Sequence, residues 1–234
     1  MPKYRDCLTR FLLEDAHVRG ALVRLDETWQ AIRARTEYPE VVADFLGQCC
    51  PASALFTASL KLEGRVSIQL RGESALRRVY AECQTDGNLR GIAHFDTPLP
   101  EQLPLSAFGP KAVLAITIEN NSAGRREPQR YQGMVGLQAD TLSGAFEDYF
   151  TQSEQLPTRL LLFTQGNQAA GLLIQQLPEA LASSEDWQRA QALFETLTAQ
   201  ELFSLEPNDV LYRLFHEESV RVLETQPLAF GCSC

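Results

Sequence analysis

The chain has 234 residues, 44% of them hydrophobic, and a formal net charge of −9. This length allows one large domain or one domain with an appendage, and no apolar run approaches the ~20 residues that span a bilayer. The acidic balance argues against a nucleic-acid-binding protein, because such proteins carry basic patches that neutralise phosphates. The first ten residues include the charged Lys3, Arg5 and Asp6, and no apolar region of a signal peptide follows them, so we expect a cytoplasmic protein.

Strand and helix patterns alternate through the first three quarters of the chain. Strand patterns occur at 17–26, 66–70, 89–95, 113–119, 131–138, 159–164 and 171–177. Apolar residues at helical spacing predict helices at 26–32, 39–50, 74–83 and 141–149. Pro51 is expected to kink or interrupt the second helix, because proline lacks the donor for the helical hydrogen bond.

Grouped strands joined by hairpins, with helices between them, predict an α+β domain with a mixed or antiparallel sheet over residues 1–178. The charge balance changes after Pro178. Residues 1–178 hold 20 acidic and 18 basic side chains, whereas residues 179–230 hold 10 acidic and 3 basic ones. We therefore place the main domain boundary at Pro178.

Residues 179–230 are expected to form a small linker domain of short, acidic, amphipathic helices. Capping patterns precede two helices, at Ser183–Asp186 and Thr198–Glu201, and a third helix is expected at 207–215. The apolar side chains on these helices include Trp187, Phe194, Leu197, Phe203, Leu211 and Phe215. Helices this short are marginal alone in water, so we expect them to dock on another part of the protein.

The six cysteines fall into two groups. Four occur in regions that read as apolar helix or loop and are expected to be small buried hydrophobes: Cys7, Cys49, Cys50 and Cys83. Cys232 and Cys234 form a C-x-C pair at the end of the sequence. Such a pair supplies two of the four thiolates of a structural zinc site, or a tight and easily reduced disulfide, or two thiols without a function.

Other chemistry finds little support in the sequence. His17, His94 and His216 lie far apart, with no spacing that indicates a set of metal ligands. No glycine-rich phosphate-binding loop and no nucleophile-elbow pattern occurs. We therefore expect a binding protein and not an enzyme.

Segments spread over the whole chain together resemble the heat shock protein 33 family. They are VRGALV at 18–23 with ET at 27–28, YQGMVGL at 131–137, EDYF at 147–150 with SEQLPTR at 153–159, NDVLYRLFHEE at 208–218, and CSC at 232–234. The resemblance implies an ATP-independent holdase that binds unfolding or oxidatively damaged proteins and prevents their aggregation. It also implies a homodimer in the active state.

The resemblance further implies that Cys232 and Cys234 act as a redox switch. In the family, four cysteines hold zinc in the reduced state, and oxidation forms disulfides, releases the zinc and unfolds the neighbouring linker. Residues 231–234 then begin a zinc domain that is largely missing from this chain, so we expect zinc in the full-length protein and none here. The apolar linker side chains from Trp187 to Phe215 are the candidate surface for the switch or for clients.

Two alternatives remain open. The first is a thiol-disulfide oxidoreductase that uses Cys232 and Cys234. Against it, oxidoreductases usually present C-x-x-C at a helix N-terminus, where the helix dipole lowers the thiol pKa. The second is an interaction module without chaperone activity, which would fail to protect unrelated unfolding proteins.

Overall fold

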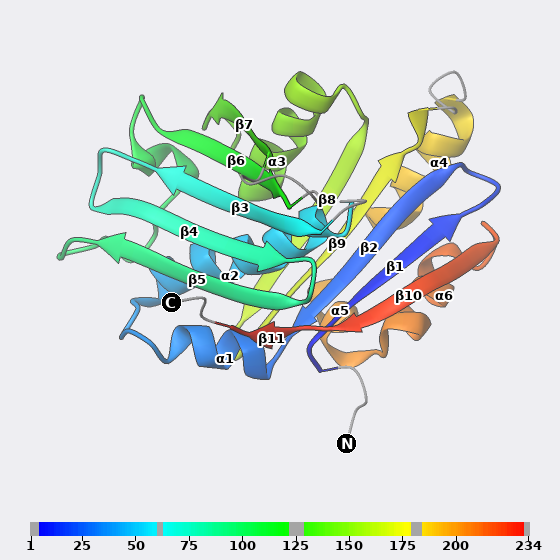
Figure 1. Cartoon of the computed structure of the whole chain (residues 1–234), viewed down its shortest axis with the longest axis horizontal. Coiled ribbons are helices and arrows are strands. Elements are labelled where there is room, and N and C mark those ends of the chain that lie inside the picture. The colour runs from blue at the N-terminus through cyan, green and yellow to red at the C-terminus, as the bar shows by residue number, and fades with distance from the viewer. Residues whose placement is uncertain (1–4, 60–62, 122–128, 179–183, 232–234) are drawn as a thin grey trace.

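The computed structural model describes residues 5–59, 63–121, 129–178 and 184–231. Two β-sheets lie side by side at an angle, with one long helix beneath them and three short helices behind one sheet (Figure 1). The expected α+β class is confirmed, and the strands pair antiparallel with one parallel exception.

The first sheet has five strands in the order β10-β1-β2-β9-β8. Their bounds are β1 Cys7–Leu13, β2 Val18–Leu25, β8 Thr158–Gln165, β9 Gln168–Gln176 and β10 Val220–Pro227. Both faces of β1, β2 and β9 carry apolar side chains, and the burial pattern of β9 is continuous after its first residue. This sheet must therefore be covered on both sides.

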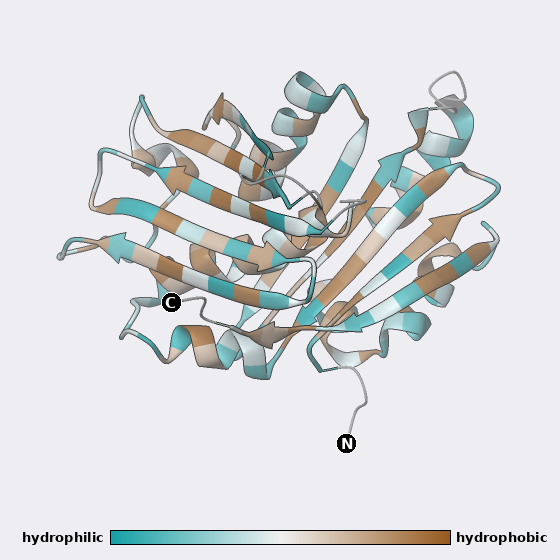
Figure 2. Ribbon diagram, viewed as in Figure 1, coloured by the Kyte–Doolittle hydropathy of each residue, from teal (hydrophilic) through white to brown (hydrophobic). Residues whose placement is uncertain are grey.

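The second sheet has six strands in the order β11-β5-β4-β3-β6-β7. Their bounds are β3 Gly64–Arg71, β4 Leu76–Gln84, β5 Asn88–Phe95, β6 Val113–Asn120, β7 Gln129–Gly136 and β11 Ala229–Phe230. Hydrophobic and hydrophilic residues alternate along β3 to β5 (Figure 2). One face of this sheet therefore faces the core and the other carries polar side chains.

Helix α2 (Glu40–Thr57) forms the centre of the main core. It contacts both sheets, and nearly every residue from Val42 to Thr57 is buried. Helices α1 (Glu27–Arg33) and α3 (Leu142–Tyr149), with the π-helical turn η2 (Phe150–Glu154) and the 3-10 turn η1 (Leu105–Phe108), complete this side. The expected helices near Trp29 and at 141–149 are confirmed.

Three short helices cover the other face of the first sheet: α4 Ser184–Phe194, α5 Ala199–Ser204 and α6 Pro207–Phe215. The capping box at Thr198 and Glu201 is present, with the Thr198 hydroxyl and the Glu201 carboxylate each accepting a backbone N–H. Ser183 lies outside the described residues. The expected short helices are thus confirmed, and the domain boundary at Pro178 stays a prediction.

Two expectations were wrong, and a third was wrong in part. The segment 74–83 is strand β4 and not a helix, with Val79, Ala81 and Cys83 facing the core. Of the expected kink or interruption at Pro51, the interruption does not occur, because α2 runs through Pro51 from Glu40 to Thr57. The last part of the expected helical linker forms strands, since β10 pairs with β1 and β11 pairs with β5.

Candidate functional site

The face of the first sheet beneath α4, α5 and α6 is continuously apolar. The side chains that point to this face come from alternate positions of three strands: Phe11, Leu13, Val18, Leu22, Ala170, Leu172 and Ile174. Each of them is 0% exposed. They belong to a cluster that is separate from the main core around α2, so the sheet divides the interior into two parts.

The six linker residues singled out in the sequence all belong to this second cluster. Their side chains are 0–9% exposed: Trp187, Phe194, Leu197, Phe203, Leu211 and Phe215. The structure therefore brings together the stripes of all three helices and buries them against one sheet face. Only a movement of the helices away from the sheet would make this surface accessible, and its role in client binding stays a prediction.

An aromatic pair joins α6 to the centre of the sheet. The rings of Phe11 and Phe215 stack with centroids 6.0 Å apart and an angle of 28° between their planes. Phe11 lies opposite Gly20 in the β1–β2 register, and a Cβ at Gly20 would overlap the Phe11 ring. Because Gly20 has no side chain, the Phe11 ring can lie over its backbone. In this position the ring stacks against Phe215.

Polar contacts connect the helices to the sheet around this apolar surface. The guanidinium of Arg24, on β2, donates hydrogen bonds of 2.6 Å to the carbonyl oxygens of Phe203 and Leu205. Arg24 is 7% exposed, so these bonds satisfy a buried charge. Arg189 on α4 donates a 3.0 Å hydrogen bond to buried Glu218, which raises the pKa of the guanidinium. Arg24 thus ties the connection between α5 and α6 to the sheet, and Arg189 ties α4 to the segment between α6 and β10.

The four described cysteines are buried, as expected. Burial raises the pKa of Cys7 to about 11 and the pKa of Cys83 to about 12. It also raises the pKa of Cys49 and Cys50. Since the thiolate is the reactive form, these thiols are poor nucleophiles and poor metal ligands at neutral pH.

Cys232 and Cys234 lie outside the described residues. Within the described part of the chain, no group of three or more His, Cys, Asp or Glu side chains is placed to hold a metal ion. A structural zinc site needs four ligands, and this chain offers two cysteines beyond its four buried ones. The residues present therefore do not fit a complete zinc site.

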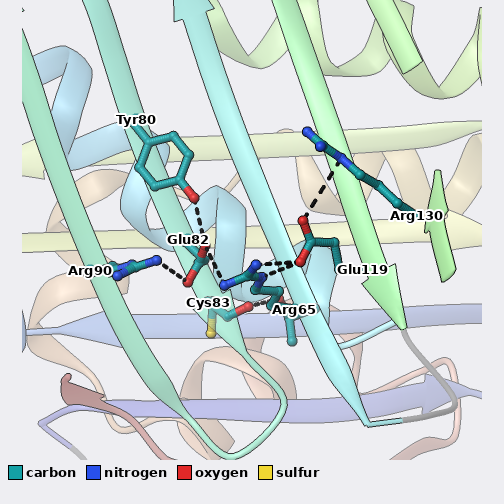
Figure 3. A network of polar contacts seen from close by, with 8 residues as sticks. Arg65, Tyr80, Glu82, Cys83, Arg90, Glu119 and Arg130 are labelled. Atoms are coloured by element: carbon teal, nitrogen blue, oxygen red, sulfur yellow. Dashed lines mark hydrogen bonds and ion pairs between the residues drawn. The ribbon is translucent and has the colours of Figure 1, made fainter. Parts of the chain in front are cut away.

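Sequence reasoning missed a charged network on the outer face of the second sheet (Figure 3). Glu82 is only 2% exposed, accepts a 2.6 Å hydrogen bond from Tyr80, and pairs with Arg90 at 3.0 Å and Arg65 at 3.7 Å. Arg65 also donates a 2.7 Å hydrogen bond to Glu119. The sequence of β4 contains a pattern that indicates this network, because Arg78, Tyr80 and Glu82 alternate with apolar residues and so share one face of the strand.

Comparisons with known proteins identify the family. The sequence model described as Hsp33 protein matches residues 6–234. A 33 kDa chaperonin of Hahella chejuensis is 44% identical over 98% of this chain and 80% of that protein. One of Chromobacterium violaceum is 40% identical over 99% and 78%. The solved 33 kDa chaperonin of Thermotoga maritima matches with a TM-score of 0.80 at 25% identity, over 99% of this chain and 81% of that one.

The shared fold and these relatives define the class of the protein, which is a molecular chaperone. Within that class the chain belongs to the Hsp33 family, which confirms the resemblance seen in the sequence. In the described residues, no helix is both long and apolar enough to cross a membrane.

Proposed function

We propose that the protein is an ATP-independent holdase whose client-binding surface is the apolar interface between the first sheet and helices α4 to α6. The observation that carries this proposal is the single buried cluster formed by Phe11, Leu22 and Ile174 of the sheet with Phe194 and Phe215 of the helices. An apolar sheet face covered by short helices can be uncovered without unfolding the main core, because the two clusters are separate.

The energetics of the helices favour such an opening. The three helices have 11, 6 and 9 residues, below the length at which isolated helices persist in water. Each buried aromatic side chain contributes roughly 150–250 Å², so separation would expose more than the ~300–600 Å² of the largest apolar patch on a typical monomer. A surface of that size can bind unfolded chains.

The chain connects this interface to the cysteine pair. After α6 it passes through β10 and β11 to Gly231, which directly precedes Cys232. We propose that Cys232 and Cys234 are thiols in the resting state and form a disulfide when an oxidant of the peroxide class removes two electrons and two protons. Zinc in the full-length protein would supply folding free energy on this side of the switch. The buried thiols of Cys7, Cys49, Cys50 and Cys83 take no part.

Further properties belong to this proposal. Clients are unfolding or oxidatively damaged proteins, and the active form is a homodimer. The protein acts in the cytoplasm and binds neither nucleic acid nor membranes, in agreement with its net charge of −9. Binding without covalent chemistry requires no catalytic residue, so we propose that the protein is not an enzyme.

Light scattering of a thermally unfolding client tests the proposal with the 234-residue chain. We expect suppression of aggregation without ATP, and nearly equal suppression with and without reductant, because the residues present do not complete the zinc site in either redox state. The Cys232→Ser, Cys234→Ser double variant is the matched control and should behave like the parent chain. Complete silencing by reductant would overturn the expected redox independence, and failure to protect several unrelated clients would overturn the holdase proposal.

Two measurements separate the alternatives. Native mass spectrometry should show no stoichiometric zinc on this chain. Turnover of a model disulfide substrate, lost in the double variant, would instead support the thiol-disulfide oxidoreductase.

A further inference from the structure

A cavity of about 750 Å³ lies at the β5 edge of the second sheet, far from the helix-covered face of the first. Its lining residues come from the segment after α1, from β4 and β5, and from β11. Figure 1 shows where these elements lie in the fold. The volume is in the range of small-molecule sites, ~300–1,000 Å³. Six lining side chains matter for its chemistry: Arg35, Arg78, Arg90, Tyr38, Tyr80 and Phe230.

The cavity is basic in a protein that is acidic. Three of its lining residues are arginines, and none of the described residues that line it is Asp or Glu. Arg90 is compensated by Glu82 at 3.0 Å. Arg35 and Arg78 form no ion pair with any described residue, and both are exposed. Two positive charges therefore face the cavity without a carboxylate partner.

Both of these arginines lie over aromatic rings. The guanidinium carbon of Arg35 is 4.6 Å from the ring centroid of Phe230, and that of Arg78 is 5.6 Å from the ring centroid of Tyr80. A guanidinium held over a ring keeps its in-plane N–H groups available, and their fork geometry matches phosphate oxygens. The arrangement orients donors before any ligand is bound.

An apolar surface lies beside the charges. Ile92 lies opposite Tyr80 in the β4–β5 register and is 44% exposed. Ile92, Tyr80 and Phe230 together offer a surface on which a planar ring can stack. A ligand that uses the whole cavity therefore has an anionic part and a flat apolar part.

We propose that this cavity binds a phosphorylated small molecule with a planar ring, of the nucleotide class. A phosphate monoester carries about 1.5 to 2 negative charges at pH 7, which matches the two arginines without carboxylate partners. A carboxylate would neutralise only one of them. The binding itself does not rest on the proposed holdase activity, and it requires no covalent chemistry.

Occupancy would also stabilise β11. This strand is held by hydrogen bonds from the Ala229 N–H to Gly87 O and from the Gly231 N–H to Leu89 O, each 3.1 Å long. A ring that stacks on Phe230 adds contacts to the paired state only. The ligand would thereby hold in place the segment that leads to Cys232 and Cys234.

Isothermal titration calorimetry of the 234-residue chain with AMP, adenosine and inorganic phosphate tests the site. We expect AMP to bind at least about tenfold more tightly than either part alone, since each part loses a charge-assisted or stacking contact. Absence of AMP binding overturns the proposal. Equal binding of phosphate and AMP overturns the ring-binding part of it.

Substitutions at the exposed Ile92 provide a matched pair. Ile92→Glu places a carboxylate among the arginines and should weaken AMP binding by at least about tenfold, whereas the neutral Ile92→Gln removes only an apolar contact and should weaken it clearly less. Arg78→Gln should weaken binding, and Arg130→Gln, on β7 at the opposite end of the sheet, should not. Equal losses in the Glu and Gln variants, or in the Arg78 and Arg130 variants, would contradict the assignment.

Hydrogen exchange tests the effect on β11. AMP should slow exchange of the Gly231 amide in the parent chain and leave it unchanged in Ile92→Glu. If AMP binds by calorimetry but the exchange rate of the Gly231 amide does not change, the proposed effect on β11 is overturned. The binding site alone would then remain.

Discussion

Replacement of Phe215 by alanine should open the helix-covered face selectively. Phe215 is 0% exposed and stacks on Phe11 at 6.0 Å, so the change removes an aromatic contact from the centre of the interface. Substitutions of this kind cost about 3–5 kcal/mol. If the helices leave the sheet as a local unit, about 3 kcal/mol raises the open population by roughly two orders of magnitude. The variant should suppress client aggregation at lower chaperone concentrations than the parent chain.

Hydrogen exchange with mass spectrometry measures the local effect. Peptides from α4 to α6 should exchange about a hundredfold faster in Phe215→Ala, while peptides from α2 keep their parent rates. Tyr212→Ala is the control, because Tyr212 lies on the same helix and is 72% exposed, and its effect should stay within about 0.5 kcal/mol. Equal acceleration of α2 and α4–α6 would refute the reasoning, since the helices would then open only with the whole protein.

Two further changes follow from the same interface and from the buried thiols. Gly20→Ala should destabilise the protein by about 1–3 kcal/mol in urea unfolding, because its Cβ overlaps the Phe11 ring, and Phe11→Leu in the same chain should recover part of that loss. The pKa of Cys7 is raised by burial to about 11, so its contribution to stability is intact below pH 9 and is lost as the pH rises from about 9 to 11. Relative to Cys7→Ala, the parent chain should lose up to about 2–3 kcal/mol over that interval, and a constant difference would show that Cys7 ionises normally in the folded state.

The elements that could be predicted from the sequence are those in which the spacing of apolar residues within the element itself indicates helix or strand. Helices α4 to α6 and strands β6 and β7 are of this kind. Strand β4 was mistaken for a helix because Leu76, Val79 and Tyr80 also fit helical spacing. The deciding fact is the pairing of β4 with β3 and β5, which buries Val79, Ala81 and Cys83 on one side. Tertiary pairing outweighs local spacing in such short segments.

Strands β1 and β10 show a second limit. They pair with each other across more than two hundred residues, and β10 is almost fully exposed, so its sequence has no apolar alternation. The same limit applies to the sites. The apolar side chains of the linker helices could be recognised from their spacing, but their sheet partners Phe11 and Leu22 become visible only when β1 and β2 are placed under the helices. The basic cavity joins residues from four separate segments, which no local pattern reveals.

The segment 220–230 belongs to both sheets, and this has a mechanical consequence. Strand β11 is two residues long and β10 is eight, and buried Leu228 lies between them with its N–H bonded to the Asp6 carbonyl oxygen. A pulling force applied to the chain at Cys232 acts first on the two-residue strand β11 and then on the eight-residue strand β10. Rupture of β11 frees the chain from the second sheet while β10 still anchors the segment that follows α6. The connection therefore yields in two steps of unequal strength, and only the second step frees the chain that follows the helices from the first sheet.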